Sequence, residues 1–414
     1  MRIHPDSFVF TLLLGLLSSL PTFGIDMILP SLSATGADLG VASADVSFAM
    51  TVYLLGVGAA LPVYGPVSDR FGRKPIVVFG CALVIIASVG CIFARSLPQL
   101  LFFRALQGAG ASGPGMAAVT IVSDLFDGEA ARAKMSNVVF AVNVVPMIAP
   151  TVGAALLAVG GWRTIYLVPI VGGFMLLGGM GGFNESARID PNIRLSPTAI
   201  VRDYLRVLRN PLCVGYLLCN AAAVGAVFAY ISGSSLFFMD VLGLSTYQYG
   251  LIFGTSSLSI MIGTLVNKRL GGRVSPSQMI AIGLALSTVM ATSLLVMAIT
   301  GGKSIAIVVS VMIGVALSLG LISPNAMNAA LRPMPDIAGS ISAVMAFVQM
   351  IAAASSSAFV AALFDGRSAL SMAVVMVSFC VLAIASYVGV VGTAKRFTQC
   401  ANTRLILEND GDVL

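Results

Sequence analysis

The sequence predicts an all-α polytopic membrane protein with twelve transmembrane helices in two pseudo-symmetric six-helix bundles. Of the 414 residues, 58% are hydrophobic and only 10% are charged, whereas a soluble chain carries about 25% charged residues. The apolar residues fall into long runs, and about 20 consecutive apolar residues can cross a bilayer as a helix. Because the runs are unbroken, they exclude a transmembrane barrel, whose strands of about ten residues alternate in polarity.

The apolar runs are grouped as six, a polar break, and six more. They lie at 8–32, 46–64, 76–94, 98–122, 135–159, 162–183, 212–239, 247–266, 277–299, 303–327, 339–364 and 368–393. We therefore expect an N-terminal bundle over residues 1–183, a linker at 184–211, a C-terminal bundle over 212–393 and a cytoplasmic tail at 394–414.

The linker contains the signal for a short helix. Ser196 followed by Pro197 is a typical helix start, and Val201, Leu205 and Leu208 then alternate with arginines. This pattern favours an amphipathic helix on the cytoplasmic face of the membrane. A plain tether between the bundles is an equal alternative.

The net charge of +6 reflects membrane topology rather than a nucleic-acid partner. When the N-terminus is placed in the cytoplasm, all but five of the 23 Lys and Arg lie on that side or in the linker and tail. The exceptions are Arg95, Arg163, Lys303 and Arg367 outside, and Arg104 within a helix. This asymmetry follows the positive-inside rule and puts both termini in the cytoplasm.

The first run contains one charged residue, Asp26. A carboxylate in the middle of a membrane helix costs roughly 2.5–3.5 kcal/mol on insertion scales. Pro21 and Pro30 flank it and weaken the helix locally. A chain keeps such a group only beside a wet cavity or a partner, so we interpret Asp26 as a proton- or cation-binding site. The alternative is a permanent ion pair.

The segment between the second and third runs combines charges with glycines. Gly65, Asp69, Arg70, Gly72 and Arg73 are expected to form a tight turn in which Asp69 accepts from Arg70 or from the amide end of a neighbouring helix. We call these five residues the latch and expect it to be made or broken as the bundles rock. The alternative is a basic loop that only fixes topology.

The latch has a degraded copy in the second half of the chain. Gly263 and Asn267 follow the eighth run at the spacing of Gly65 and Asp69. Weak repetition at an offset of six helices is typical of a transporter built from two related bundles.

The fourth run carries Arg104 and Gln107, which share one helix face because they are three residues apart. Counting from the outer ends of their helices places Arg104 and Asp26 at matched depth. A cation there would favour the charged form of the carboxylate. A static structural ion pair is the alternative.

The fifth run contains Pro146, Pro150 and Gly153. They predict two kinks and a small-residue face against the opposite bundle, which together would form a pliant outer gate. Ordinary membrane-helix prolines are nearly as good an explanation.

These motifs resemble those of a known family. The latch is similar to the signature loop of the major facilitator superfamily, and the segments at Arg104 and Pro150 resemble its second and exporter signatures, with Ala149 where glycine is common. Together with Asp26-Met27-Ile28-Leu29-Pro30, the N-terminal half looks like the Bcr/CflA multidrug exporters. The resemblance implies the major facilitator fold, a bacterial inner membrane, and alternating-access export of amphenicol- or bicyclomycin-like drugs against protons. It also implies that Asp26 is the proton-responsive acid with Arg104 beside it.

Large or polar side chains in the expected cavity helices are candidates for substrate contact. They are Phe23, Asp26, Met27, Tyr53, Gln107, Phe140, Asn143, Phe228, Tyr230 and Phe237.

The expected partners are a small-molecule drug, protons and the lipid bilayer, and we expect a monomer without nucleic acid. The cysteines lack the spacing of metal ligands, and no zinc, nucleophile-elbow or phosphate-loop motif is present, so no enzyme, cofactor or metal is expected. Two other functions fit the same pattern. One is a proton-coupled exporter of a metabolite such as a sugar or amino acid, and the other is a receptor or scaffold with a transporter fold.

Overall fold

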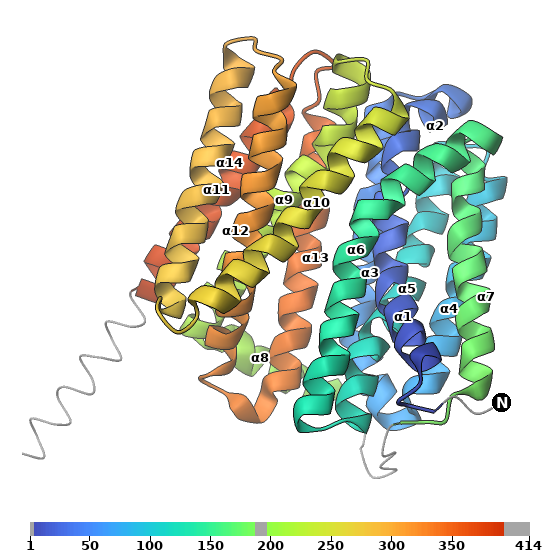
Figure 1. Cartoon of the computed structure of the whole chain (residues 1–414), viewed down its shortest axis with the longest axis vertical. Helices are drawn as coiled ribbons and strands as arrows, with labels where there is room; N and C mark the ends of the chain where they lie inside the picture. Colours follow the sequence, from blue (N-terminus) through green and yellow to red (C-terminus); the bar gives the residue numbers. More distant parts are fainter. Residues whose placement is uncertain (1–3, 187–196, 393–414) are drawn as a thin grey trace, which may run out of the picture.

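The structure is a computed structural model that describes residues 4–186 and 197–392. Its described residues form helices joined by turns and loops, with no strand. Figure 1 shows two groups of long helices side by side, one from each half of the chain. The predicted tail at 394–414 lies outside the described residues.

The N-terminal half contains six long helices and three short ones. These are α1 (Phe8–Asp26), the 3-10 helix η1 (Leu29–Ser31), α2 (Leu32–Leu39), α3 (Ser43–Phe71), α4 (Arg73–Phe93), α5 (Leu97–Leu125), α6 (Gly128–Gly160), the 3-10 helix η2 (Trp162–Tyr166) and α7 (Leu167–Gly182).

The second half begins with α8 (Pro197–Arg209) in the linker. The remaining elements are α9 (Pro211–Ser235), the π-helix η3 (Leu236–Val241), α10 (Thr246–Leu270), α11 (Pro276–Ile299), α12 (Ile305–Leu331), the 3-10 helix η4 (Pro335–Ile337), α13 (Ala338–Ala362), α14 (Leu370–Ala385) and the π-helix η5 (Ser386–Val391).

Eleven helices of the described chain are long and apolar enough to cross a membrane. The twelfth long helix, α5, is less apolar because it carries Arg104, Gln107 and a run of small residues. It packs against α3 and α4 inside the N-terminal half. With α5, whose polar residues are buried inside its own bundle, the described chain has the twelve long helices that the sequence predicts.

The same close packing recurs in both halves. A Cβ on Gly108 of α5 would lie 2.1 Å from the Tyr53 carbonyl oxygen of α3, and one on Gly263 of α10 would lie 2.3 Å from the Leu317 oxygen of α12. These are the second and fourth long helices of each half. Glycine lets the two backbones touch, as membrane helices do where small residues line the interface.

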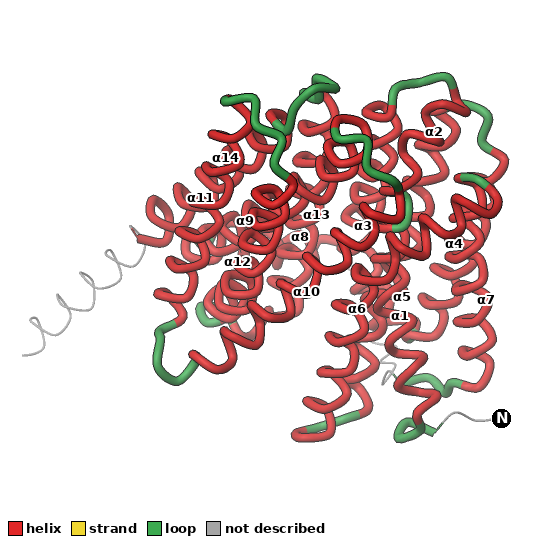
Figure 2. The backbone as a smooth tube through the Cα atoms, turned by 45° about the horizontal axis from the view of Figure 1, so that its top comes forward, coloured by secondary structure: helices red, strands yellow, loops and turns green. Residues whose placement is uncertain are grey.

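The molecule has two ends that we name by their elements. The linker end carries the N-terminus and α8, and the α2 end carries α2 and the turn at Gly161. Near the α2 end, α10 packs on α6, where Gly254 approaches the Met147 carbonyl oxygen. Figure 2 shows the two halves close together near α2 and farther apart toward the linker end.

Candidate functional site

Asp26 lies where the first membrane helix breaks. It is the last residue of α1, and the chain continues through η1, which contains Pro30. The side chain is buried, and no hydrogen bond or ion pair to it is formed by the described residues. It lies within electrostatic range of the phenols of Tyr53 in its own half and of Tyr230 and Tyr249 in the other. Asp26 is therefore a buried acid that faces both halves.

Arg104 is the largest fully buried side chain of the described residues. Its guanidinium donates to the Gly24 carbonyl oxygen at 2.7 Å, to the Ala49 oxygen at 3.3 Å and to the Gln107 side chain. It also lies 4.3 Å from the centre of the Tyr53 ring. Arg104 thus ties α5 to the backbones of α1 and α3.

The expected depth of Arg104 agrees with this geometry, but the expected charge pair is not formed. The guanidinium contacts α1 at Gly24, two residues before Asp26, and its partners are carbonyl and amide oxygens. The backbone oxygen at Gly24 competes for the cation because α1 breaks there and leaves its last carbonyls without helical partners. The sequence alone does not reveal such a free carbonyl.

Gln107 extends this polar network away from Asp26. Its side-chain amide donates to the Ser88 hydroxyl of α4 at 2.7 Å. On the other side of Arg104, the Tyr53 hydroxyl donates to the Pro21 carbonyl oxygen of α1 at 2.9 Å. The cluster of Tyr53, Arg104 and Gln107 therefore stabilises the bent α1.

The kinked helix α6 packs against the break in α1. Pro146 and Pro150 both lie inside α6. A Cβ on Gly153 would lie 2.6 Å from the Met27 carbonyl oxygen. The small face at Gly153 therefore packs on its own bundle, and the prediction that it faces the opposite bundle is wrong. The contact with the opposite bundle uses glycines of α10 instead, with Gly250 against Thr151.

The latch lies at the linker end, mostly within a helix. The predicted turn is wrong for Gly65, because α3 continues to Phe71 and the turn is made at Gly72, whose φ is 99°. Asp69 accepts from Arg73 at 2.6 Å, not from Arg70. Arg70 lies over the Phe71 ring.

Two acidic residues of the latch region were not expected from the sequence. Asp124, at the end of α5, accepts from Arg73 at 2.9 Å. Glu185 accepts the backbone N–H groups of Arg73 and Lys74 at 2.8 and 3.0 Å. Glu185, and not Asp69, therefore occupies the amide end of α4, where the helix dipole favours an anion. Asp69 and Asp124 belong to the N-terminal half and Glu185 to the start of the linker, so none of these partners comes from the C-terminal half.

The degraded copy of the latch has a different partner. Asn325 of α12 donates to the Asn267 side chain at 2.6 Å. Asn267, the counterpart of Asp69, thus takes part in an amide pair and not in an ion pair.

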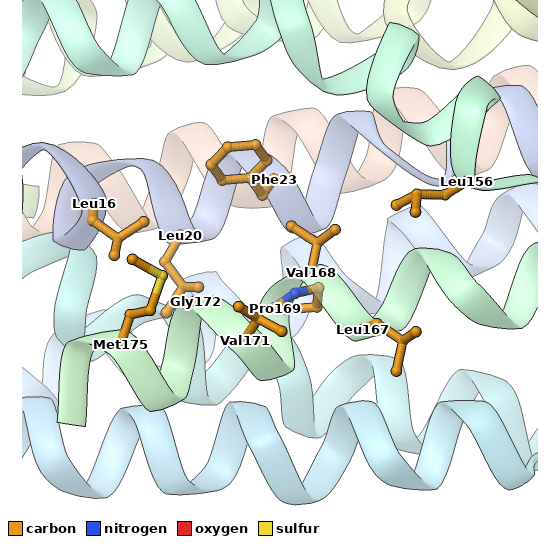
Figure 3. Close-up of a pocket in the computed structure, with 10 residues that line it drawn as sticks. All are labelled: Leu16, Leu20, Phe23, Leu156, Leu167, Val168, Pro169, Val171, Gly172 and Met175. Carbon is orange, nitrogen blue, oxygen red and sulfur yellow. The ribbon is translucent and has the colours of Figure 1, made fainter. Parts of the chain in front are cut away.

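The substrate candidates are dispersed over several environments. Phe23 lines an apolar cavity of about 360 Å³ with residues of α1, α6 and α7, as Figure 3 shows. Met27 is buried near Val145 and Ala149, and Phe140 is 59% exposed. Asn143 donates to the Val139 carbonyl oxygen of its own helix.

The C-terminal candidates lie in the core of their half. Tyr230 packs near Phe253 with ring centres 6.3 Å apart, Phe237 packs on Phe238, and Phe228 is partly buried beside them. The structure thus brings Asp26, Tyr53 and Tyr230 near one another and leaves Phe23 and Phe140 apart from them.

A polar contact between the halves at the α2 end was also not expected. Asp240, in η3, accepts hydrogen bonds from the Ser33 hydroxyl at 2.6 Å and from the Ser43 hydroxyl. Ser235 donates to the Leu29 carbonyl oxygen at 2.6 Å. We call Ser33, Ser43 and Asp240 the clasp. Nothing in the sequence predicts the clasp, because its residues come from opposite halves.

Comparisons with known proteins agree with this architecture. Residues 12–357 match the family described as the Major Facilitator Superfamily. A bicyclomycin resistance protein homolog of Haemophilus influenzae is 27% identical over 88% of this chain and 91% of its own. A chloramphenicol resistance protein of Pseudomonas aeruginosa is 28% identical over 80% and 79%. The multidrug transporter MdfA of Yersinia pestis is 29% identical over 68% and 69%.

Solved structures with the same fold are more distant in sequence. A bacterial homolog of the human lysosomal transporter Spinster, in an inward-facing and unoccupied conformation, has a TM-score of 0.71 at 15% identity, covering 94% of this chain and 97% of its own. A D-xylose–proton symporter has a TM-score of 0.70 at 17% identity, covering 92% and 98%. These likenesses confirm the predicted fold class.

Proposed function

Since the chain belongs to the Major Facilitator Superfamily, we propose that it exports small lipophilic drugs from the cytoplasm in exchange for protons. The family match and the relatives' names confirm the resemblance read from the motifs and identify a transporter rather than an enzyme. The chain is a multi-pass membrane protein of bacterial type. The relatives are named for bicyclomycin, chloramphenicol and multidrug resistance, and we carry that substrate class over to this chain.

The observation that carries the proposal is the position of Asp26. It is a buried acid at the break in α1 and forms no ion pair with a cationic side chain among the described residues. It lies within reach of tyrosines from both halves. A carboxyl group in such a place changes its protonation when water, a proton or a ligand reaches it. Motion of one half against the other changes the access of water, protons and ligands to Asp26.

We assign Asp26 the coupling role in alternating access. Protonation from the outside and drug binding from the inside exclude one another there, and each step favours a different arrangement of the two halves. One proton moving down 100 mV supplies roughly 2.3 kcal/mol, which corresponds to a drug gradient of about 50-fold.

The orientation follows from the charges. The linker end faces the cytoplasm of the bacterial inner membrane and both termini lie there, in keeping with the positive-inside rule. The α2 end, with the clasp, then closes the outer side, and the latch lies on the cytoplasmic side. We propose that a single copy of the chain, a monomer, carries out transport.

The test is drug uptake into proteoliposomes with an acidic interior. We expect labelled chloramphenicol or bicyclomycin to accumulate, a protonophore to abolish accumulation, and Asp26→Asn to remove it while the protein stays folded. Asp45→Asn, the same change at an exposed acid of α3, is the matched control and should transport normally.

Three results would contradict the proposal. If a labelled sugar or amino acid accumulated and the drugs did not, the chain would be a metabolite exporter. Uptake that ignores the pH gradient would remove proton coupling, and normal uptake by Asp26→Asn would place the coupling site elsewhere.

A further inference from the structure

The linker end of the C-terminal half carries an excess of basic residues. Among the described residues, the exposed ones there are Arg202, Arg206, Arg209, Lys268, Arg269, Arg273 and Arg332. The acidic residues of the same region are Asp203 and Asp336.

The same end of the N-terminal half is balanced in charge. Its described basic residues are Arg70, Arg73, Lys74, Arg132 and Lys134, and its acidic ones are Asp6, Asp69, Asp124, Asp127, Glu129 and Glu185. A topology signal alone would not require one half to be basic and the other neutral. The excess of basic residues in the C-terminal half therefore calls for an explanation besides membrane topology.

The helix α8 borders this basic region and has three distinct faces. Val207 is fully buried, and Tyr204 donates to the Pro62 carbonyl oxygen of α3 at 3.3 Å, so these two residues hold α8 on the protein. Val201, Leu205 and Leu208 are 53%, 44% and 53% exposed. They are three and four residues apart and so form one apolar stripe.

An arginine stripe runs beside the apolar one. Arg202, Arg206 and Arg209 each follow an apolar stripe residue by one position, which is about 100° around the helix. Arg206 donates to Asp336 of η4 at 3.1 Å, whereas Arg202 lies 4.0 Å from Asp203. Arg209 has no acidic partner among the described residues. Arg209 is thus free of an acidic partner, and Arg202, whose side chain is 74% exposed, forms only a long ion pair, so both guanidinium groups can reach an external anion.

We infer that α8 docks on the anionic headgroups of the bilayer, with Val201, Leu205 and Leu208 inserted at the level of the acyl-chain boundary. An exposed apolar stripe beside a row of cations is typical of helices that lie in a membrane interface. The bilayer is the partner that surrounds a multi-pass protein, and Figure 1 places α8 across the linker end of the C-terminal half. Guanidinium groups form bidentate hydrogen bonds with phosphate. The ligand that we assign to α8 is therefore a phospholipid with net negative charge.

The contacts of α8 give this docking a structural consequence. Tyr204 connects it to α3 of the N-terminal half, and Arg206 connects it to η4 of the C-terminal half. A helix held at the membrane surface and bonded to both halves limits how far they separate at the linker end.

The test uses tryptophan quenching by brominated lipids. The chain has one tryptophan, Trp162, so Leu205→Trp in a Trp162→Phe background reports on α8 alone. The protein is reconstituted in vesicles of phosphatidylcholine and phosphatidylglycerol, and one of the two lipids is brominated on its acyl chains. Phe79→Trp in the same background is the reference, because Phe79 is 58% exposed on the membrane helix α4.

We expect both brominated lipids to quench Leu205→Trp and brominated phosphatidylglycerol to do so with about fivefold preference or more, since each arginine near an anionic surface contributes about that factor. The preference should fall to near one in Arg202→Gln/Arg209→Gln. It should persist in Lys303→Gln/Arg367→Gln, the same charge change at the exposed opposite end.

Absence of quenching at position 205, with normal quenching at position 79, would show that the apolar stripe is not in the bilayer. Equal quenching by the two lipids, or a preference that survives Arg202→Gln/Arg209→Gln, would overturn the headgroup assignment. None of these results depends on transport, so they leave the drug-export proposal to its own test.

Discussion

At the residue scale, Arg104 acts through backbone oxygens. Its guanidinium contacts Gly24 and Ala49 in two other helices and the side chain of Gln107 in its own. A buried acceptor that loses its donor costs about 1–3 kcal/mol. The residue therefore stabilises the bent form of α1 that presents Asp26, and its charge is secondary to its five-donor shape.

Replacing Arg104 should lower stability first. We expect Arg104→Ala to reduce the free energy of unfolding by at least about 2 kcal/mol, because two backbone oxygens lose their donor. Arg104→Lys should recover only part of this, since one ammonium cannot span three acceptors. The measurement is thermal unfolding in detergent, with the exposed Arg95→Ala as control. A lysine variant with full stability and transport would show instead that the charge alone matters.

At the element scale, the apolar runs predicted where helices cross the membrane but not where they end. Bilayer thickness sets the length of the apolar run, whereas a helix continues until its caps or a special backbone conformation stop it. Thus α3 continues to Phe71 and stops at Gly72, and α6 begins at Gly128 rather than at 135. The predicted turn of the latch is therefore made at Gly72 and not at Gly65, which lies within α3.

Partners from distant helices were beyond the reach of the sequence. Asp26, Arg104 and Arg73 stood out because a charge within or beside an apolar run is costly. Asp124 and Glu185 lie at helix ends, where acids are ordinary, so nothing distinguished them before the fold joined them to Arg73. The candidate aromatic residues were equally uninformative, because a membrane helix has large side chains on every face.

The packing of α6 on α1 makes a prediction for Gly153. A Cβ there would lie 2.6 Å from the Met27 carbonyl oxygen and 3.2 Å from Pro30. Gly153→Ala should therefore push α6 away from the break in α1, lower stability by about 1–3 kcal/mol and reduce drug uptake in proteoliposomes. Gly178→Ala in α7 is the matched control, because a Cβ at Gly178 meets no atom within 4 Å. Equal behaviour of the two alanine variants would show that the α1–α6 contact is not tight in the membrane.

At the scale of the whole molecule, the polar contacts between the halves are concentrated at the α2 end. The described hydrogen bonds from one half to the other are those of the clasp and of Ser235 at the α2 end, and that of Tyr204 at the linker end. Alternating access requires such contacts to break on one side while others form on the opposite side. We therefore expect the clasp to be formed when the α2 end is closed and broken when that end opens.

Asp240 should accordingly bias the equilibrium between the two states. Its carboxylate is exposed, so its two hydroxyl partners stabilise closure by only about 1 kcal/mol, and Asp240→Ala should raise the separated population at the α2 end about fivefold. The measurement is the distribution of distances between spin labels at the exposed Ala37 of α2 and Tyr247 of α10, in a cysteine-free background. Asp365→Ala removes an exposed acid at the same end that bonds only within its own loop, and it should leave the distribution unchanged. Identical distributions for wild type and Asp240→Ala would mean that apolar packing between the halves, and not the clasp, holds the α2 end closed.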